Sequence, residues 1–380
     1  MRILFLTDGV HPFQLGGMQK HSLILCDLLL KKGLSIDVVH PGGKGYSAEK
    51  FKEQFTETEK LKEIQIDFPK TDPFPGHYIR ENKAYSKSIY QAVREEMGSY
   101  DLIYAQGFTA WHFLKMKAAG EILIPIFVNF HGFEMYQKPP SLRVKAEYVL
   151  FKKTVKWMVN EADYVYSFGG QINRIIQNLG VAKDRIISQS NGIKADWIRS
   201  EVSSIGEERK FVFVGRNERR KGIEELNKAL EVLLEDKSKR FNVQFVGPIP
   251  TEVQLKDDRI HYHGEIRDAE KIKAILDESD CLLCPSHSEG MPTVILEAMA
   301  RGLAIMGTDV GAVSRMINAN GILLPTPEPK LIQSAIEKII QLNSTQLEDY
   351  KKQSLRLVKE QFIWEVIAQQ KINDFKEVLK

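Results

Sequence analysis

The chain of 380 residues is long enough for two or three domains of about 150 residues each. Hydrophobic residues make up 43% and charged residues 27%, so the composition excludes a chain that is disordered throughout. The 53 basic and 50 acidic residues leave a net charge of +3, which argues against a protein that coats nucleic acid. The three cysteines exclude a disulfide scaffold and favour a reducing compartment.

The apolar stretches are short. Ile3–Leu6, near the N-terminus, is below the length of a signal-peptide core. The longest later stretch, Ile122–Val128, contains a proline and falls well short of the roughly 18 residues that span a bilayer. We therefore expect a cytoplasmic protein, for which attachment to a membrane surface remains open.

Short apolar runs alternate with helical periodicity in the first half of the chain. Ile3–Leu6 is predicted to be a buried strand, Met18–Lys32 a helix and Ile36–Val39 the next strand. A β-α-β unit of this kind predicts a parallel sheet. The further strands predicted in this half are Leu102–Ala105, Ile124–Asn129 and Tyr164–Ser167.

The pattern loosens over residues 191–208, where we predict a linker, and then begins again. The strands predicted in the second half are Phe211–Val214, Val243–Val246, His261–His263, Cys281–Cys284, Ala304–Gly307 and Ile322–Leu324. The helices predicted there are Ile223–Leu234, Ala269–Leu276 and Thr293–Ala300, and the last fifty residues are expected to be helical. Two such halves predict two doubly wound domains that hold a ligand between their facing strand ends.

The first candidate site is Leu15-Gly16-Gly17-Met18, which follows the first strand and opens a helix. Glycine lets a ligand approach the backbone, and the N-terminus of a helix favours an anion. The alternative is a flexible connector. The motif is not a G-x-G-x-x-G fingerprint, so it gives little support to a dinucleotide site.

A second candidate, Val214–Gly222, occupies the equivalent position in the second half. Its cations Arg216 and Lys221 would flank a helix N-terminus, where a guanidinium and an ammonium bind phosphate. The alternative is ordinary surface charge.

The third candidate contains two acids, Glu289 in a loop and Glu297 in the helix that follows it. The loop carboxylate can accept hydrogen bonds from sugar hydroxyls, and the helix carboxylate can bind the paired hydroxyls of a ribose. The alternative is one acid that complements the helix dipole and a second that is simply exposed.

These motifs, in this order, resemble those of the retaining glycosyltransferases of family 4. The paired-glutamate motif is Glu289–Ala300. The other elements that match are Gly16-Gly17, His131-Gly132, Ser190–Ile193, the pair Arg216 and Lys221, and Gly302–Gly311. One departure is Glu134, which stands where the family often has an aspartate.

The resemblance implies a GT-B fold, in which two Rossmann-like domains face each other across a cleft. Residues 1–190 would form the acceptor-binding domain, 191–208 the linker and 209–361 the domain that binds the nucleotide sugar. The last helix, within 362–380, would cross back onto the first domain.

The resemblance also implies roles for individual residues. Arg216 and Lys221 would neutralise the diphosphate, Glu289 would contact the donor sugar, and His131 would lie beside the reacting sugar. Glu297 would bind the ribose. The remaining residues implied in nucleotide or phosphate binding are Gly16, Gly17, Ile266, Gly290, Met291 and Pro292.

The implied reaction is transfer of a hexose, with retention, from a UDP-sugar or, next, a GDP-sugar. The acceptor would be a lipid-linked saccharide or a polysaccharide of the cell envelope. The chain has no Asp-x-Asp motif, so we expect no metal and no other cofactor. The alternatives are a catalytically silent nucleotide-sugar binder and an enzyme similar to the sugar-nucleotide epimerases.

Residues 138–158 combine basic and apolar side chains in one predicted helix. A basic amphipathic helix can lie on an anionic membrane, and the alternative is a domain helix with a solvated basic face. We keep peripheral contact with an anionic membrane as a hypothesis.

Overall fold

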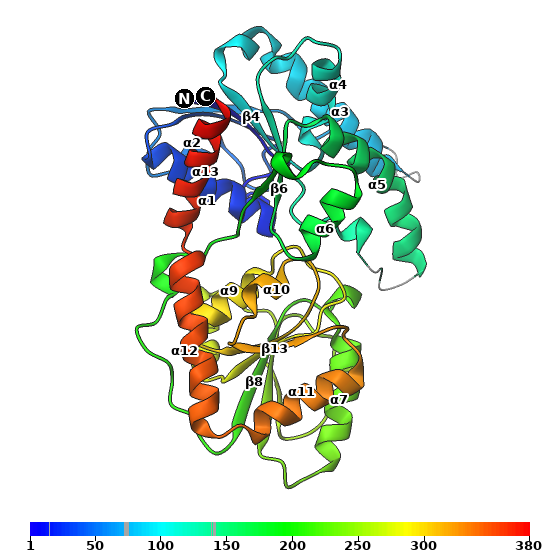
Figure 1. Cartoon of the computed structure of the whole chain (residues 1–380), viewed down its shortest axis with the longest axis vertical. Helices are drawn as coiled ribbons and strands as arrows, with labels where there is room; N and C mark the ends of the chain where they lie inside the picture. Colours follow the sequence, from blue (N-terminus) through cyan, green and yellow to red (C-terminus); the bar gives the residue numbers. More distant parts are fainter. Residues whose placement is uncertain (15, 72–75, 138, 140–141) are drawn as a thin grey trace.

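A computed structural model describes residues 1–14, 16–71, 76–137, 139 and 142–380, with only the backbone described at 142–144, 146 and 147. Two domains lie one above the other along the longest axis, and both termini lie at the end of the first domain (Figure 1). None of the described helices combines the length and apolar character that crossing a bilayer requires.

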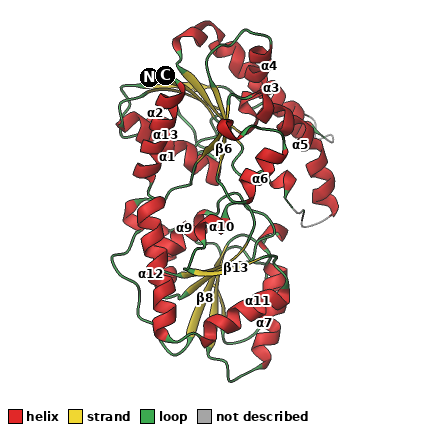
Figure 2. Ribbon diagram, viewed as in Figure 1, coloured by secondary structure: helices red, strands yellow, loops and turns green. Residues whose placement is uncertain are grey.

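The first domain is built on a seven-stranded parallel sheet with the order β3-β2-β1-β4-β5-β6-β7. Its strands are β1 (Arg2–Leu6), β2 (Ser35–His40), β3 (Leu61–Gln65), β4 (Leu102–Gln106), β5 (Ile126–Asn129), β6 (Tyr164–Ser167) and β7 (Ile186–Ser188). Its helices are α1 (Gly17–Lys31), α2 (Ala48–Lys52), α3 (His77–Val93), α4 (Trp111–Ala118), α5 (Leu142–Glu161) and α6 (Gln171–Asn178). Figure 2 shows these helices around the strands.

The second domain has a six-stranded parallel sheet with the order β10-β9-β8-β11-β12-β13. Its strands are β8 (Arg209–Val214), β9 (Phe241–Val246), β10 (Ile260–Tyr262), β11 (Cys281–Cys284), β12 (Ala304–Thr308) and β13 (Gly321–Leu324). The helices of this half are α7 (Ile223–Glu235), α8 (Ala269–Asp277), α9 (Thr293–Ala300), α10 (Val313–Met316), α11 (Pro329–Gln341), α12 (Ser344–Gln361) and α13 (Trp364–Val378).

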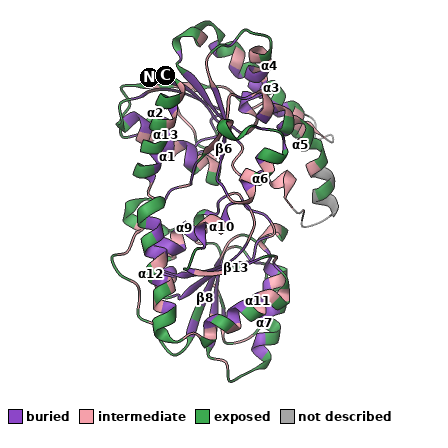
Figure 3. Ribbon diagram, viewed as in Figure 1, coloured by how far each residue is buried: buried purple, intermediate pink, exposed green. Residues whose placement is uncertain are grey.

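The central strands read as continuous apolar runs because both faces of each sheet are covered. In β1, Ile3 and Phe5 belong to one buried cluster and Leu4 and Leu6 to another, as the alternation of side chains along a strand requires. The central strands are therefore buried in both domains, while the outer faces of the helices are exposed (Figure 3).

Helix α13 leaves the second domain and packs on α1 of the first (Figure 1). At the crossing, Ile193 forms an isolated parallel bridge with Ile363. Further along α13, Ile372 and Phe375 are buried in the apolar cluster of the first domain. The prediction of two facing Rossmann-like domains, with a C-terminal helix that crosses back, is thus confirmed.

Every strand named from the sequence is present, with ends shifted by no more than two residues. Two edge strands, β3 and β7, were not predicted. The burial of β3 is only partial, and its sequence, LKEIQ, mixes polar with apolar residues. The strand β7 has three residues, too few for a periodicity to be recognised.

Candidate functional site

A cavity of 520 Å³ lies between the two domains, at the facing carboxyl ends of their strands. The first domain lines it with Gly17, Met18, Phe130, His131, Glu134, Phe168 and Asn191. The second domain lines it with Val214, Arg220, Lys221 and the segment from Glu289 to Val294. A second cavity of 330 Å³ adjoins the first, since both are lined by Gly17, Asn191 and Thr293.

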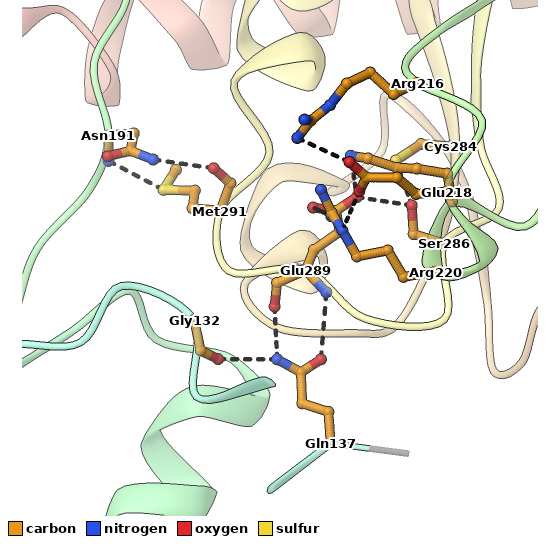
Figure 4. Close-up of polar contacts among 11 residues, drawn as sticks. Gly132, Gln137, Asn191, Arg216, Glu218, Arg220, Cys284, Ser286, Glu289 and Met291 are labelled. Atoms are coloured by element: carbon orange, nitrogen blue, oxygen red, sulfur yellow. Dashed lines mark hydrogen bonds and ion pairs between the residues drawn. The ribbon is translucent and has the colours of Figure 1, made fainter. Parts of the chain in front are cut away.

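Glu289 is the centre of an ionic cluster in the larger cavity (Figure 4). The Lys221 ammonium lies 2.6 Å from its Oε1, and an Arg220 guanidinium nitrogen lies 3.3 Å from its Oε2. The Ser286 hydroxyl donates a further hydrogen bond of 2.8 Å to Oε1. Because the Glu289 carboxylate is almost fully buried, these donors compensate for its loss of hydration. The cluster holds two cations at the wall of the cleft.

The structure brings Lys221, but not Arg216, to Glu289. The Arg216 side chain is 71% exposed and pairs with Glu218 at 2.9 Å, so it does not line the cavity (Figure 4). Arg220, which the sequence analysis did not select, takes that place. Both arginines lie on the turn between β8 and α7, and only the path of that turn decides which one faces the cleft. A role of Arg216 on the diphosphate stays a prediction.

The two domains are in close contact at Gly290. A Cβ at this position would lie 3.1 Å from both the Cα of Gly132 and the carbonyl oxygen of His131. Met291 and Pro292 follow in the cavity wall and lead into α9, whose N-terminus has no side-chain cap. Uncapped N–H groups at a helix N-terminus favour an anion. Gly290, Met291 and Pro292 thus line the cavity, and their contact with a phosphate stays a prediction.

Glu297 lines the smaller cavity, together with Lys20, Lys273 and Trp197. Burial raises the pKa of Glu297, and the charge of Lys20 opposes this shift. Its carboxylate has no hydrogen bond or ion pair among the described side chains, so its oxygens are available to ligand hydroxyls.

Of Gly16, Gly17 and Ile266, only Gly17 lines the two cavities. Gly17 lines both of them and has open space where a Cβ would stand. Gly16 is the N-cap residue of α1. Ile266 is partly buried against an apolar cluster of the second domain and lines neither cavity. Its role in binding the nucleotide stays a prediction.

His131 follows β5 and has a positive φ of 59°. Its backbone N–H donates to Asn129 Oδ1 at 3.0 Å, and its ring Nε2 lies 3.3 Å from Gln106 Oε1. Burial lowers the pKa of His131 to about 3, and the positive charge of Lys371 contributes. The imidazole is therefore neutral at physiological pH.

His21, on α1, was not selected from the sequence. Its ring lies edge-on to the ring of His131, with 5.0 Å between the centroids, and its Nδ1 lies 3.1 Å from Asn191 Oδ1. Burial also lowers the pKa of His21. A histidine inside a predicted helix gives no sign of this position, because only the tertiary fold brings the two rings together.

Glu134, the departure from the family pattern, lies in the cavity wall near Arg220. Burial raises the pKa of Glu134, while the charge of Arg220 lowers it. A Cβ at Gly132 would lie 2.0 Å from Glu134 Oε1, so the carboxyl group folds back against the Gly132 backbone.

Side-chain amides join the domains across the cleft. Gln137 Nε2 donates to the carbonyl oxygens of Gly132 at 2.9 Å and Glu289 at 2.6 Å, while its Oε1 accepts from Glu289 N–H at 3.3 Å (Figure 4). Asn191 Nδ2 donates to the Met291 carbonyl oxygen at 3.0 Å. These contacts fix the position of Glu289 relative to His131. Asn191 lies in the segment Ser190–Ile193 that the resemblance had marked, whereas no motif marks Gln137 in the sequence.

No group of three or more histidine, cysteine, aspartate or glutamate side chains is placed to hold a metal ion in the described part of the chain. The basic segment 138–158 falls mainly in α5. Lys138 and the side chains of Arg143 and Glu147 lie outside the described residues. The described lysines Lys145, Lys152, Lys153 and Lys156 are exposed, as are Val149 and Leu150.

Two family models match the chain in succession. Residues 15–197 match the model described as Glycosyltransferase Family 4, and residues 208–342 match the model described as Glycosyl transferases group 1.

Among curated relatives, the chain is 26% identical over 299 residues to the putative teichuronic acid biosynthesis glycosyltransferase TuaC of Bacillus subtilis, covering 75% of this chain and 74% of that protein. It is 25% identical over 249 residues to the O-antigen biosynthesis glycosyltransferase WbnH of Escherichia coli, covering 62% of this chain and 66% of the relative.

Solved structures share the fold. Sucrose-phosphate synthase of Thermosynechococcus elongatus superposes with a TM-score of 0.78 at 17% identity, covering 99% of this chain and 98% of the other. Anabaena HepE, solved in complex with UDP and glucose, superposes with a TM-score of 0.67 at 15% identity, covering 99% and 100%.

Proposed function

The chain belongs to the family 4 glycosyltransferases, and we propose that it transfers a hexose from a nucleoside-diphosphate sugar to a saccharide acceptor with retention of configuration. The observation that carries this proposal is the ionic cluster in the cleft. Lys221 and Arg220 stand beside the uncapped N-terminus of α9, and both face the cavity between the domains. Such a site stabilises the charge that develops on a departing diphosphate.

The proposed reaction is a front-side attack through an oxocarbenium-like state. The bond between the anomeric carbon and the diphosphate oxygen breaks, and the acceptor oxygen bonds to the same face of that carbon. The departing phosphate oxygen takes the acceptor's proton. His131 is neutral, so in this scheme it positions the sugar by hydrogen bonding and is not the acid that protonates the leaving group.

For the donor, we propose a UDP-sugar first and a GDP-sugar second. Support comes from HepE, which was solved in complex with UDP-glucose. The diphosphate would lie against Lys221 and the N-terminus of α9, and the ribose hydroxyls would bind Glu297 in the adjoining cavity. Because cations and helix N–H groups supply positive charge at this place, we propose that the transfer needs no metal.

For the acceptor, we propose a lipid-linked saccharide in polysaccharide assembly. The relatives named for teichuronic acid and O-antigen biosynthesis support this choice. A row of aromatic rings also leads from the cavity to α5. Phe130 lines the cavity and lies 5.6 Å from Phe108, whose ring lies 5.9 Å from that of Phe151.

The outer face of α5 suits the surface of an anionic membrane. Val149 is 61% exposed and Leu150 49% exposed, and exposed lysines flank both. Apolar side chains that enter the headgroup region, next to cations, are typical of helices that bind membranes at the interface. We therefore propose that α5 brings the cleft to a lipid-linked acceptor.

Liposome flotation tests this part of the proposal. Wild-type protein should float with vesicles that contain phosphatidylglycerol, and much less with phosphatidylcholine alone. Replacing Val149 and Leu150 by serine should abolish flotation, whereas the same change at Val232 and Val253, exposed in the second domain, should not. Flotation that survives the α5 change would contradict the proposed contact.

Thermal unfolding tests the donor site. UDP, GDP, ADP and NAD are each added with and without EDTA. A ligand at a hundred times its dissociation constant adds about 2.7 kcal/mol of stability and raises Tm by several degrees. One nucleoside diphosphate should raise Tm regardless of EDTA, and Glu297→Ala should remove the effect. A response to NAD alone would refute the proposal.

A further inference from the structure

A third cavity, of 350 Å³, lies where the first domain, the second domain and the crossing helix α13 meet, and we call it the hinge cavity. It shares no lining residue with either cavity described above. It is enclosed by the end of β7, the helix α10 and the junction of α12 with α13. The lining residues that matter below are Gln189, Arg315, Val366, Ile367, Lys371 and Asp374. The first domain, the second domain and the crossing helix therefore all contribute to one cavity.

Lys371, on α13, is 1% exposed and forms no ion pair in the described structure. Its ammonium donates one hydrogen bond of 2.5 Å to Gln189 Oε1 and lies 3.1 Å from the centroid of the Tyr166 ring. A buried lysine ordinarily has a carboxylate partner, because a buried unpaired charge costs several kcal/mol. The Gln189 oxygen is the one hydrogen-bond acceptor of Lys371 among the described residues, and the ammonium otherwise lies over the rings of Tyr166 and Tyr104, the latter at 5.1 Å.

Arg315 and Gln189 contribute further hydrogen-bond donors to the cavity, and neither has an anionic partner in the described structure. The Arg315 guanidinium donates to the carbonyl oxygens of Phe168 at 2.6 Å and Gln189 at 2.9 Å, and it forms no ion pair within the described chain. Gln189 is 6% exposed, and its buried Nε2 has no hydrogen-bond partner. Buried donors without acceptors are rare in folded proteins and indicate an absent partner.

Asp374 is the only acid in the lining, and it lies beyond ion-pair distance of both cations. Its Oδ1 accepts a long hydrogen bond of 3.4 Å from Gln370, and its buried Oδ2 has no donor. Burial raises the pKa of Asp374 and lowers the pKa of Lys371, so each group is less charged than it would be in water. The Arg315 guanidinium stays protonated, so the lining keeps a positive excess, and an anion in the cavity would favour the charged form of Lys371.

We propose that this hinge cavity binds a small phosphate-bearing anion, held by Lys371, Arg315 and the amide of Gln189. Phosphate oxygens would accept hydrogen bonds from the ammonium and the amide, and a guanidinium complements them well. A phosphate group fills only part of the 350 Å³, so the ligand class is a phosphate ester whose remainder lies against Val366 and Ile367.

The bound anion would act on both domains at once. Arg315 belongs to the second domain and Lys371 to the crossing helix, while Gln189 follows the last strand of the first domain. An anion that engages all three would stabilise the arrangement in which the domains face each other. Lys371 is also close enough for its charge to lower the pKa of His131, so the ligand would change the electrostatics beside the reacting sugar.

Calorimetric titration with orthophosphate, at constant ionic strength, tests the proposal. Phosphate could also bind at the donor site, so the titration is done on wild type and on Lys221→Ala, which lacks a donor-site cation. We expect equal affinity in both proteins. Lys371→Met should bind phosphate at least tenfold more weakly. Binding lost in Lys221→Ala but kept in Lys371→Met would show a donor-site anion only and overturn the proposal, as would no binding to wild type.

A second variant keeps the test decisive if Lys371→Met does not fold. Ser188 is exposed at the rim, and its Oγ lies 3.4 Å from the Arg315 guanidinium. Ser188→Glu would place a carboxylate beside that cation and should weaken phosphate binding at least tenfold. Ser204→Glu, an identical charge change in the exposed linker, should leave binding unchanged. Equal phosphate affinity in the two glutamate variants would refute the assignment.

Discussion

Gly290→Ala tests whether the close approach of the two domains is required for catalysis. The added methyl carbon would lie 3.1 Å from Gly132 Cα and from the carbonyl oxygen of His131. Both neighbours are main-chain atoms, so the contact relaxes only if the loop or a whole domain moves by a few tenths of an ångström. The φ angle of Gly290 is not positive, so alanine adds steric overlap without backbone strain.

The magnitude follows from the cost of overpacking, which is about 1–3 kcal/mol for an added methyl group in a tight contact. The overlap exists only when the domains face each other, so this free energy opposes formation of the complete site. At about 1.4 kcal/mol per tenfold change in rate, kcat/KM should fall by about 5- to 150-fold.

The assay is the release of nucleoside diphosphate from the sugar donor, measured as initial rates. Gly206→Ala is the matched control, because a Cβ at Gly206 meets no atom within 4 Å and its φ is not positive. The control should retain wild-type kcat/KM. A Gly290→Ala enzyme within twofold of wild type would refute the argument that this contact forms part of the catalytic arrangement.

Three further substitutions test charges in the structure. Lys221→Met removes the cation 2.6 Å from Glu289, and calorimetry should show nucleoside-diphosphate affinity lower by about 10- to 100-fold, the worth of a charged hydrogen bond. The pKa of His131 is lowered to about 3 from 6.5, so the unfolded chain binds a proton that the folded chain does not, and stability falls as pH drops through this window. His131→Asn should therefore reduce the slope of unfolding free energy between pH 5 and pH 6.5, measured in urea, by up to about 1.4 kcal/mol per pH unit. Lys351→Met removes the ion-pair partner of the buried Asp280 carboxylate, 3.0 Å away, and should lower the unfolding free energy by about 3–5 kcal/mol. Lys352→Met, which breaks an exposed pair with Glu348, should lower it by less than about 0.5 kcal/mol.

Each of these expectations has an outcome that contradicts it. Unchanged nucleotide affinity in Lys221→Met would remove the ammonium from the proposed diphosphate site. Parallel pH slopes for wild type and His131→Asn would mean that the histidine titrates alike in the folded and unfolded chains. Equal losses of stability at Lys351 and Lys352 would contradict the importance of the buried pair.

The sequence was sufficient to predict the strands that are buried on both faces. Runs such as Ile3–Leu6 and Cys281–Cys284 are continuously apolar because helices cover both sides of the sheet, and that pattern survives in the sequence. Edge strands lack this requirement, so β3 and β7 carry no comparable pattern. The same local logic identified the turn that carries Lys221 and the loop that carries Glu289, because both follow buried strands.

The side chains that complete the site could not be found in this way. Arg216 and Arg220 are close neighbours on one turn, and the direction of the turn decides which of them reaches Glu289. Gln137 and His21 come from segments with no motif, and they reach the cleft only because η3 (Glu134–Tyr136) and α1 are folded against it.

The sequence by itself predicted the strands of the two parallel sheets that are buried on both faces and several of the helices, because burial on two faces and helical periodicity leave local patterns. The tertiary structure alone decided which charges meet. In the sequence, Lys371 is indistinguishable from the other charged residues of a terminal helix. In the structure it is only 1% exposed, because α13 packs it against the first domain. Burial and pairing of a charge depend on elements far apart in the chain, and no local pattern encodes them.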